Sequence, residues 1–376
     1  MQKFFGQPRL ITNILPHRKV SWLELFYDLI FAVVLARLTD PLVEDFTPAR
    51  FAYATIVFAW FFWSWHDTSG YFDNHGNATL INLFLISAQV VITGVAALYI
   101  PVAVGGDFRP LFPWMVVMSA LLSLIWRLIA AIDVHHAPAS RIWSRAYAGV
   151  AVLLIVGWFA PATWLPWIAL LAAVLNFGVI LVGRGALYRE YRALGQPFVL
   201  KDSLLERYGL MTMIALGEII AGLFTYAGDE PSPTRLAGFG ASIILVALVG
   251  GVYYLMLGAV TIEMQSSLQV MAIRWLFLVV VYLLMVMAVM VDLALAHPVT
   301  VWRVALVCVL VATFLVMWII RYVTGNSENP RLLVPAMVGL MVLVGVAFVG
   351  SALVTVIAMD VAIAAAMVPA VARVQA

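Results

Sequence analysis

The chain has 376 residues, of which 65% are hydrophobic and only 11% are charged, and its mean hydropathy is +1.05. Soluble domains carry about 25% charged residues, so this composition excludes an ordinary soluble protein and indicates a polytopic membrane protein. The formal net charge of +2 says little about partners, because the positions of charged residues in a membrane protein mainly reflect which loops lie on which side of the membrane.

Apolar stretches long enough to cross a bilayer recur along the whole chain, separated by short polar, proline or glycine breaks. The sequence therefore predicts an all-α transmembrane bundle of about twelve spans. We place a tight turn at Gly350-Ser351, between the last two of them. The predicted spans are residues 21–39, 49–66, 78–100, 112–133, 142–160, 165–186, 204–226, 236–261, 269–296, 299–321, 332–350 and 352–371.

The longest polar connection divides the spans six and six, which predicts two parallel six-helix halves. The divisions are an N-terminal segment 1–20, a first half 21–186, a linker 187–203 and a second half 204–376. With the N-terminus inside, fourteen Lys and Arg residues fall on the cytoplasmic side and four or five on the outer side. This asymmetry supports an even number of spans and predicts that both termini lie in the cytoplasm.

The first span carries two acids near its start. Glu24 and Asp28 are four residues apart, so in a helix they project from one face at about 6 Å. A carboxylate inside hydrocarbon costs about 2.5–3.5 kcal/mol, so both must be neutralised, hydrated or paired. We interpret them either as an ion or proton site or as part of a structural salt bridge, for which Arg127 in the fourth span is the expected cation.

The seventh span begins Glu206-Arg207-Tyr208 and continues to Gly217-Glu218. Arg207 and Glu218 stand about 16 Å apart along a helix, so they cannot pair with each other. Glu218 lies well inside the span and needs a partner from another helix, a hydrated cavity or a proton. Gly209 and Gly217 indicate close approach between helices.

Two acids in later spans raise the same question. Asp360 lies in the middle of the twelfth span, among alanines that allow close packing and an inward-facing acid. Asp292 lies toward the outer end of the ninth span, where its side chain can reach the interface, and is a secondary candidate.

The end of the second span mixes aromatic, acidic and histidine side chains. Trp63 and Trp65 are typical of an interfacial aromatic belt. His66, Asp67 and His75 could bind a metal, but their spacing matches no recognised ligand pattern, and the chain has no nucleotide-binding loop. We expect no metal and no other cofactor, and no nucleic-acid partner.

The segment from Trp22 to Val33 resembles the opening signature of the bacterial low-temperature-requirement A family. The segment from Glu206 to Glu218 resembles that family's second signature. The resemblance implies a multi-pass bacterial inner-membrane protein, first associated with growth in the cold. It marks Glu24, Phe26, Asp28, Glu206, Arg207, Gly209, Gly217 and Glu218, with Phe72 and Asp73 in an acidic segment after the second span.

The chain also departs from the family pattern. Ser203 stands where relatives often have a histidine, three residues before the Glu206-Arg207 pair. The family's aromatic and acidic cluster at the end of the eighth span is only Tyr253-Tyr254 here. If that histidine transfers protons in relatives, this chain lacks the step.

Three functions fit these residues. The first is a channel or secondary transporter for a monovalent cation, proton or small solute, using acids on the first and seventh spans. The second is a structural or sensory membrane protein without turnover, in which the acids only join helices by pairing with Arg127 and Arg207. The third is an intramembrane enzyme acting on a lipid-like substrate through a buried carboxylate. The expected partners are the lipid bilayer, the solute and a second copy of the chain.

Overall fold

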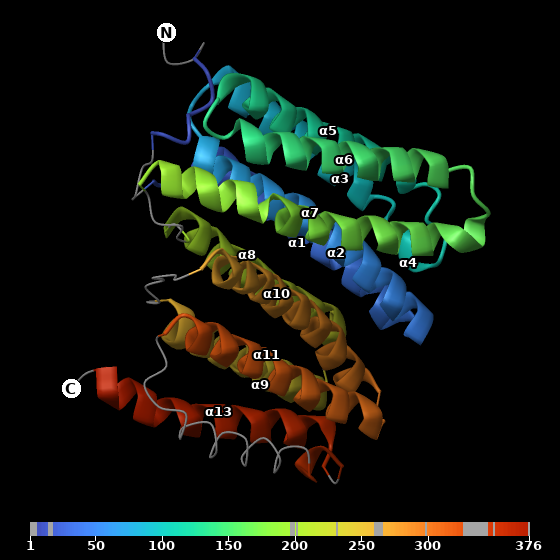
Figure 1. Ribbon diagram of the computed structural model, residues 1–376. Coiled ribbons are helices and arrows are strands. Elements are labelled where there is room, and N and C mark those ends of the chain that lie inside the picture. Colours follow the sequence, from blue (N-terminus) through green and yellow to red (C-terminus); the bar gives the residue numbers. More distant parts are fainter. Residues whose placement is uncertain are drawn as a thin grey trace. The chain divides into compact units, whose positions relative to one another are not determined.

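The structure is a computed structural model that describes residues 6–13, 18–195, 200, 202–230, 232–258, 266–297, 299–325, 345–348 and 350–374. These residues form helices and connecting turns, with no strand among them. Figure 1 shows the helices in chain order. They are α1 (Trp22–Glu44), α2 (Pro48–His75), α3 (Leu80–Ala97), α4 (Ile100–Val104), α5 (Phe112–Ile132), α6 (Ala137–Gly157), α7 (Leu165–Ala193), α8 (Asp202–Ala227), α9 (Pro233–Leu257), α10 (Ser267–Ala296), α11 (Thr300–Val323) and α13 (Ala352–Val374), with a short 3-10 turn, η1 (Ala162–Trp164), before α7.

Local sequence signals set where several helices begin. Ser21 and Glu24 form a capping box at the start of α1, in which each side chain accepts a hydrogen bond from the other residue's backbone N–H. Thr47 caps α2 by accepting a hydrogen bond from the backbone N–H of Arg50, with Pro48 in the first turn. Ser351 caps α13 in the same way, so the predicted break at Gly350-Ser351 is confirmed.

Every predicted span except one coincides with a helix. Residues 332–350 lie outside the described part of the chain, apart from 345–348 and 350. Several helices are longer than the predicted spans: α2 continues to His75 and α7 to Ala193. The difference arises because hydropathy marks the stretch that suits hydrocarbon, whereas a helix also continues through polar turns outside it.

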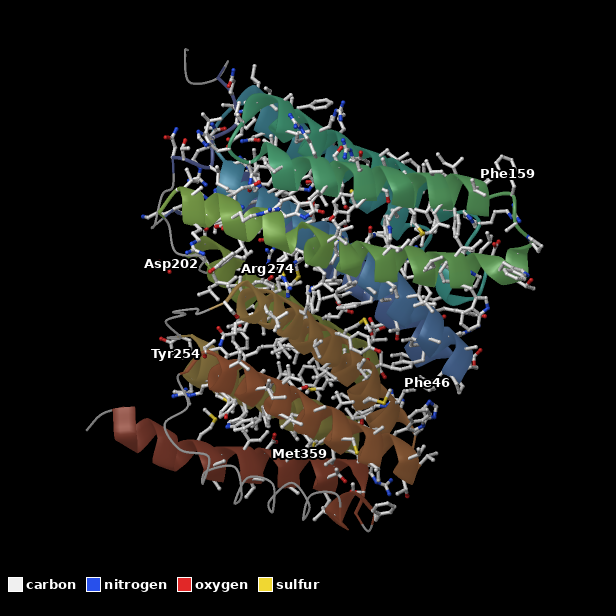
Figure 2. All side chains as sticks on the ribbon, viewed as in Figure 1. Phe46, Phe159, Asp202, Tyr254, Arg274 and Met359 are labelled. Atoms are coloured by element: carbon white, nitrogen blue, oxygen red, sulfur yellow. The ribbon has the colours of Figure 1, made fainter. Side chains whose placement is uncertain are left out.

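Eight described helices are long and apolar enough to cross a membrane, so the count of about twelve spans is not confirmed. Neither α1 nor α2 is among them, because α1 carries several charged residues and α2 is rich in polar and aromatic ones. Many large apolar side chains are exposed, among them Tyr254 on α9 at 69% and Phe159 in the turn after α6 at 83% (Figure 2). Outward apolar side chains on apolar helices are what lipid contact requires.

The chain forms two compact units, Met1–Leu210 with Met264–Met271, and Met211–Glu263 with Ala272–Ala376. In the first unit, α5 packs on α6 and α6 on α7, while α1 packs on α2, α3 and α4 (Figure 1). In the second unit, α9 packs on α11 and α13, and α11 also contacts α13. Because the boundary falls after Leu210, the first turns of α8 belong to the first unit. The division into two six-helix halves at the linker 187–203 stays a prediction.

Candidate functional site

The side chain of Glu24 is held in the first turn of α1 by several donors. Arg18 donates from Nη1 to Oε1 at 2.8 Å and from Nη2 to Oε2 at 2.6 Å. The Ser21 hydroxyl donates to the same Oε1 at 2.7 Å. Glu24 is only 1% exposed, so this carboxylate is a buried ion-pair partner with its lone pairs occupied.

Asp28, one turn further along α1, is paired with Arg207 of α8. Arg207 donates from Nε to Oδ2 at 3.1 Å and from Nη2 to Oδ1, a bidentate arrangement that fixes the guanidinium plane. The indole Nε1 of Trp65 in α2 donates to Oδ1 at 2.6 Å. Asp28 therefore joins three helices that are distant in sequence.

Arg207 is shared between the two acids of α1. Its Nη1 lies 3.7 Å from Oε2 of Glu24 and makes no hydrogen bond to any residue that the structure describes. Its guanidinium lies over the Trp65 ring at 5.6 Å from the centroid. Arg207 is 1% exposed. We call Arg18, Glu24, Asp28, Trp65 and Arg207 the ion-pair cluster. It contains two cations and two anions, so it is charge-balanced, as buried charges require.

The structure corrects the expected partner of these acids. Arg127 is exposed on α5, and α5 packs on α3 and α6 rather than on α1. Arg18 and Arg207 occupy the acids instead. The sequence offered one signal for Arg18, a basic residue just before a helix that carries an acid in its first turn. The structural alternative expected the acids to pair with Arg127 and Arg207, and only the pairing with Arg207 is found.

The aromatic-belt interpretation of the tryptophans is also wrong. Trp63 and Trp65 are 1% and 0% exposed, so they are core residues. Trp63 donates its Nε1–H to the hydroxyl of Tyr147 at 2.9 Å, and that hydroxyl donates to Asp67 at 2.8 Å. Buried indoles need such acceptors, and α2 finds them in its neighbours rather than at a membrane interface.

A second set of polar contacts fastens the start of α8 to α2. Ser203 donates its hydroxyl hydrogen to Oδ1 of Asp73, and the hydroxyl of Tyr208 lies 2.8 Å from Nδ1 of His66. Ser203 stands where the family resemblance implies a histidine, and in this chain the residue places a hydroxyl beside Asp73. These contacts explain why the first turns of α8 belong to the first unit.

The remaining residues marked by the two signatures are less buried. Glu206 is exposed, and Phe26 is 45% exposed with its ring stacked on Trp22 at 5.7 Å. Glu218 is half-buried in the second unit. No described heavy atom lies within 4 Å of a Cβ built on Gly217, so close helix approach does not explain that glycine.

Close approach occurs instead one turn after Glu218. A Cβ built on Gly222 of α8 would lie 2.5 Å from Oδ2 of Asp292, which is half-buried in α10. Asp292 therefore lies against another helix, rather than only reaching the outer interface as its position suggested. The glycine is needed because its missing side chain makes room for the carboxylate.

Asp360 of α13 differs from the acids of α1 because no basic side chain of the described residues is paired with it. It is 8% exposed, and its Oδ1 is buried without a hydrogen-bond donor among the described residues. The predicted inward orientation of this acid is therefore consistent with its burial. An unpaired carboxylate at such a place is stable only as the protonated acid or with a bound cation.

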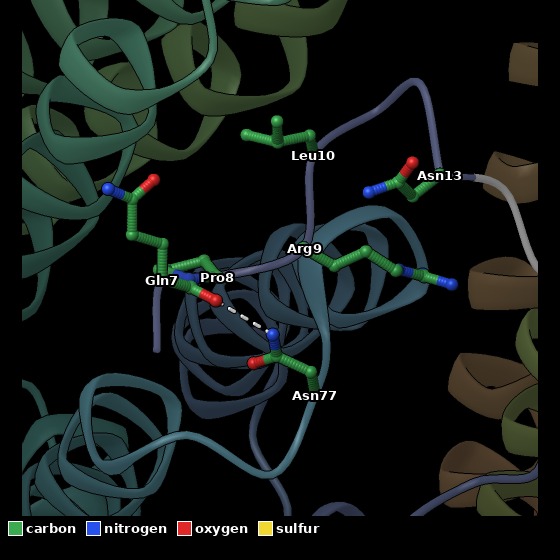
Figure 3. Close-up of a pocket in the computed structure, with 6 residues that line it drawn as sticks. All are labelled: Gln7, Pro8, Arg9, Leu10, Asn13 and Asn77. Carbon is green, nitrogen blue, oxygen red and sulfur yellow. Dashed lines mark hydrogen bonds between the residues drawn. The ribbon is translucent and has the colours of Figure 1, made fainter. Parts of the chain in front are cut away.

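The N-terminal segment lies over the end of α2 and forms a shallow surface groove. Gln7, Pro8, Arg9, Leu10, Asn13 and Asn77 line it (Figure 3). Asn77 donates to the backbone oxygen of Gln7 at 2.8 Å. Burial and the nearby Arg18 lower the pKa of Arg9, whose Nε donates to the backbone oxygen of Asn74. No residue of the ion-pair cluster lines this groove, and its contacts close the end of α2.

Comparison with known proteins identifies the family of the chain. Residues 19–371 match the family model described as bacterial low temperature requirement A protein, LtrA. The match includes all of the ion-pair cluster except Arg18, and also Asp360. No curated protein and no solved structure matches the chain.

Proposed function

We propose that this chain, which belongs to the LtrA family of bacterial membrane proteins, is a secondary transporter or channel. Its solute is a monovalent cation, a proton or a small molecule, and it acts in the inner membrane with both termini in the cytoplasm. The proposal rests on the ionisable side chains in apolar helices. Such side chains are costly in a membrane, and where they occur they commonly mark the route of a transported ion or proton.

The observation that carries the proposal is the unpaired carboxylate of Asp360. The acids of α1 are occupied by Arg18 and Arg207, so neither can take up a cation without first losing an arginine. In the described part of the chain, no donor is bonded to the buried Oδ1 of Asp360, so no such bond opposes protonation or cation binding there. We therefore assign the titrating step of transport to Asp360, and we assign to the ion-pair cluster the role of holding α1, α2 and α8 together.

A second function, a structural or sensory protein without turnover, is favoured by the ion-pair cluster itself. Each carboxylate there is bonded to an arginine and to a further donor, and the three buried charged residues are each 1% exposed. A charge-balanced cluster in which each carboxylate is bonded to an arginine joins helices and leaves neither acid free to bind a cation. In this alternative Asp360 is a protonated packing residue.

Flux measurements with the purified protein in liposomes separate these functions. We expect proton, Na⁺ or K⁺ flux above protein-free liposomes, reduced at least tenfold by Asp360→Asn, which removes the titrating group but keeps its shape. The matched control is Asp229→Asn, at an exposed acid of the same unit. Absence of flux for every cation and small solute tested would overturn transport. Flux that is unchanged in Asp360→Asn would overturn the assignment of this acid.

A further inference from the structure

A cluster of neutral polar side chains lies inside the first unit, where α1, α2 and α3 meet. Its members are Tyr27 of α1, Ser64 and Thr68 of α2, and Gln89 and Thr93 of α3. We call them the hydroxyl cluster. All are between 0% and 2% exposed. Neutral polar groups buried this deeply cost free energy unless each finds a hydrogen-bond partner.

Part of the hydroxyl cluster satisfies itself. Ser64 donates to the backbone oxygen of Phe61 at 2.7 Å, and Thr68 donates to that of Ser64 at 2.7 Å. The amide Nε2 of Gln89 donates to the hydroxyl oxygen of Thr68 at 2.7 Å. This last bond fixes the orientation of the Gln89 amide and leaves its Oε1 directed elsewhere.

Three atoms of the cluster have no hydrogen-bond partner among the residues that the structure describes: Oη of Tyr27, Oε1 of Gln89 and Oγ1 of Thr93. The Tyr27 hydroxyl lies close enough to interact with the hydroxyls of Thr93, Ser64 and Thr68, but none of these contacts has hydrogen-bond geometry. Gln89 and Thr93 are one helical turn apart, so they share a face of α3. Thr93 is unusual here, because Thr68 and the other buried hydroxyls of α2 donate to their own helix. The unpaired atoms supply two hydroxyl donors and one carbonyl acceptor.

We propose that the hydroxyl cluster is an internal hydration site, in which bound water accepts hydrogen bonds from Tyr27 and Thr93 and donates one to Gln89. A buried water makes about three hydrogen bonds to groups that are otherwise unsatisfied, which matches these three atoms in number and type. A metal cation fits less well, because the cluster contains no carboxylate and the charge of Arg207 acts on Tyr27. This inference does not depend on the transport proposal.

Radiolytic footprinting of the purified wild-type protein tests the proposal directly, because X-rays split bound water and the radicals oxidise the side chains beside it. Tyr27 and Tyr147 form a matched pair: both are 0% exposed, but the hydroxyl of Tyr147 is bonded to Trp63 and Asp67. We expect Tyr27 to be oxidised at least threefold faster than Tyr147. Equal, slow oxidation of both would overturn the proposal.

Thr93→Val provides a second measurement, because valine keeps the shape of threonine and removes its hydroxyl. If water is bound, the variant loses a hydrogen bond, and we expect its melting temperature to fall by about 2 °C or more. Oxidation of Tyr27 should fall as well. A dry cluster predicts the opposite sign, because removing an unpaired buried hydroxyl is neutral or stabilising. An unchanged or higher melting temperature would therefore overturn the proposal. If Thr93→Val does not fold, the oxidation rates of Tyr27 and Tyr147 in the wild-type protein test the proposal by themselves.

Discussion

Replacing Arg207 by methionine tests the central role of the ion-pair cluster. Methionine keeps a long, flexible side chain but removes both hydrogen bonds to Asp28 and the charge that faces Glu24. Glu24 keeps Arg18 as its partner, whereas Asp28 keeps only the indole donor of Trp65. The main effect therefore falls on one buried carboxylate, that of Asp28.

The expected magnitude follows from that remaining charge. Removing one partner of a buried ion pair costs about 3–5 kcal/mol, because the other charge stays in a low dielectric without compensation. The double variant Asp28→Asn with Arg207→Met removes both charges, and its asparagine oxygen still accepts the hydrogen bond from Trp65. We expect the double variant to recover most of the loss, which corresponds to a coupling energy of about 2–3 kcal/mol.

Thermal unfolding in detergent, followed by size-exclusion chromatography of the heated samples, measures these effects. Arg127→Met is the matched control, since this arginine is exposed on α5, and its melting temperature should stay within about 1 °C of wild type. We expect Arg207→Met to melt at least roughly 6 °C lower. The reasoning is refuted if Arg207→Met is as stable as the control, or if the double variant is no more stable than Arg207→Met.

Two glycine substitutions test the packing of the separate units in the same assay. Gly183→Ala in α7 places a Cβ 2.1 Å from Nε1 of Trp143, a clash that should destabilise by about 1–3 kcal/mol despite the better helix propensity of alanine. Gly222→Ala should be destabilising for the corresponding reason, because its Cβ would meet Asp292 at 2.5 Å. Gly217→Ala serves as the control, since no described atom lies within 4 Å of its Cβ, and it should be neutral or stabilising by up to about 1 kcal/mol. Equal melting temperatures for all three variants would contradict this account of the glycines.

The sequence alone determined the all-helical membrane character and the places where helices begin. Apolar runs and the polar breaks between them are formed by residues that are adjacent in sequence. The same is true of helix caps such as Ser21 with Glu24 and of the break at Gly350-Ser351. The spacing of Glu24 and Asp28 likewise placed both acids on one helix face, which the shared arginine confirms. These features are local, so a single chain read in order reveals them.

Only the tertiary structure decided which charges meet. Asp28 and Arg207 are 179 residues apart, and nothing in the intervening sequence says that α8 rather than α5 supplies the cation. The choice depends on which helices pack and on how each is rotated about its axis: Arg127 faces outward on α5, while Arg207 faces the interior of the first unit. The burial of Trp65, and the contrast between the paired acids of α1 and the unpaired Asp360, follow from the same packing, because a side chain's partner is fixed by neighbours in space and not in sequence.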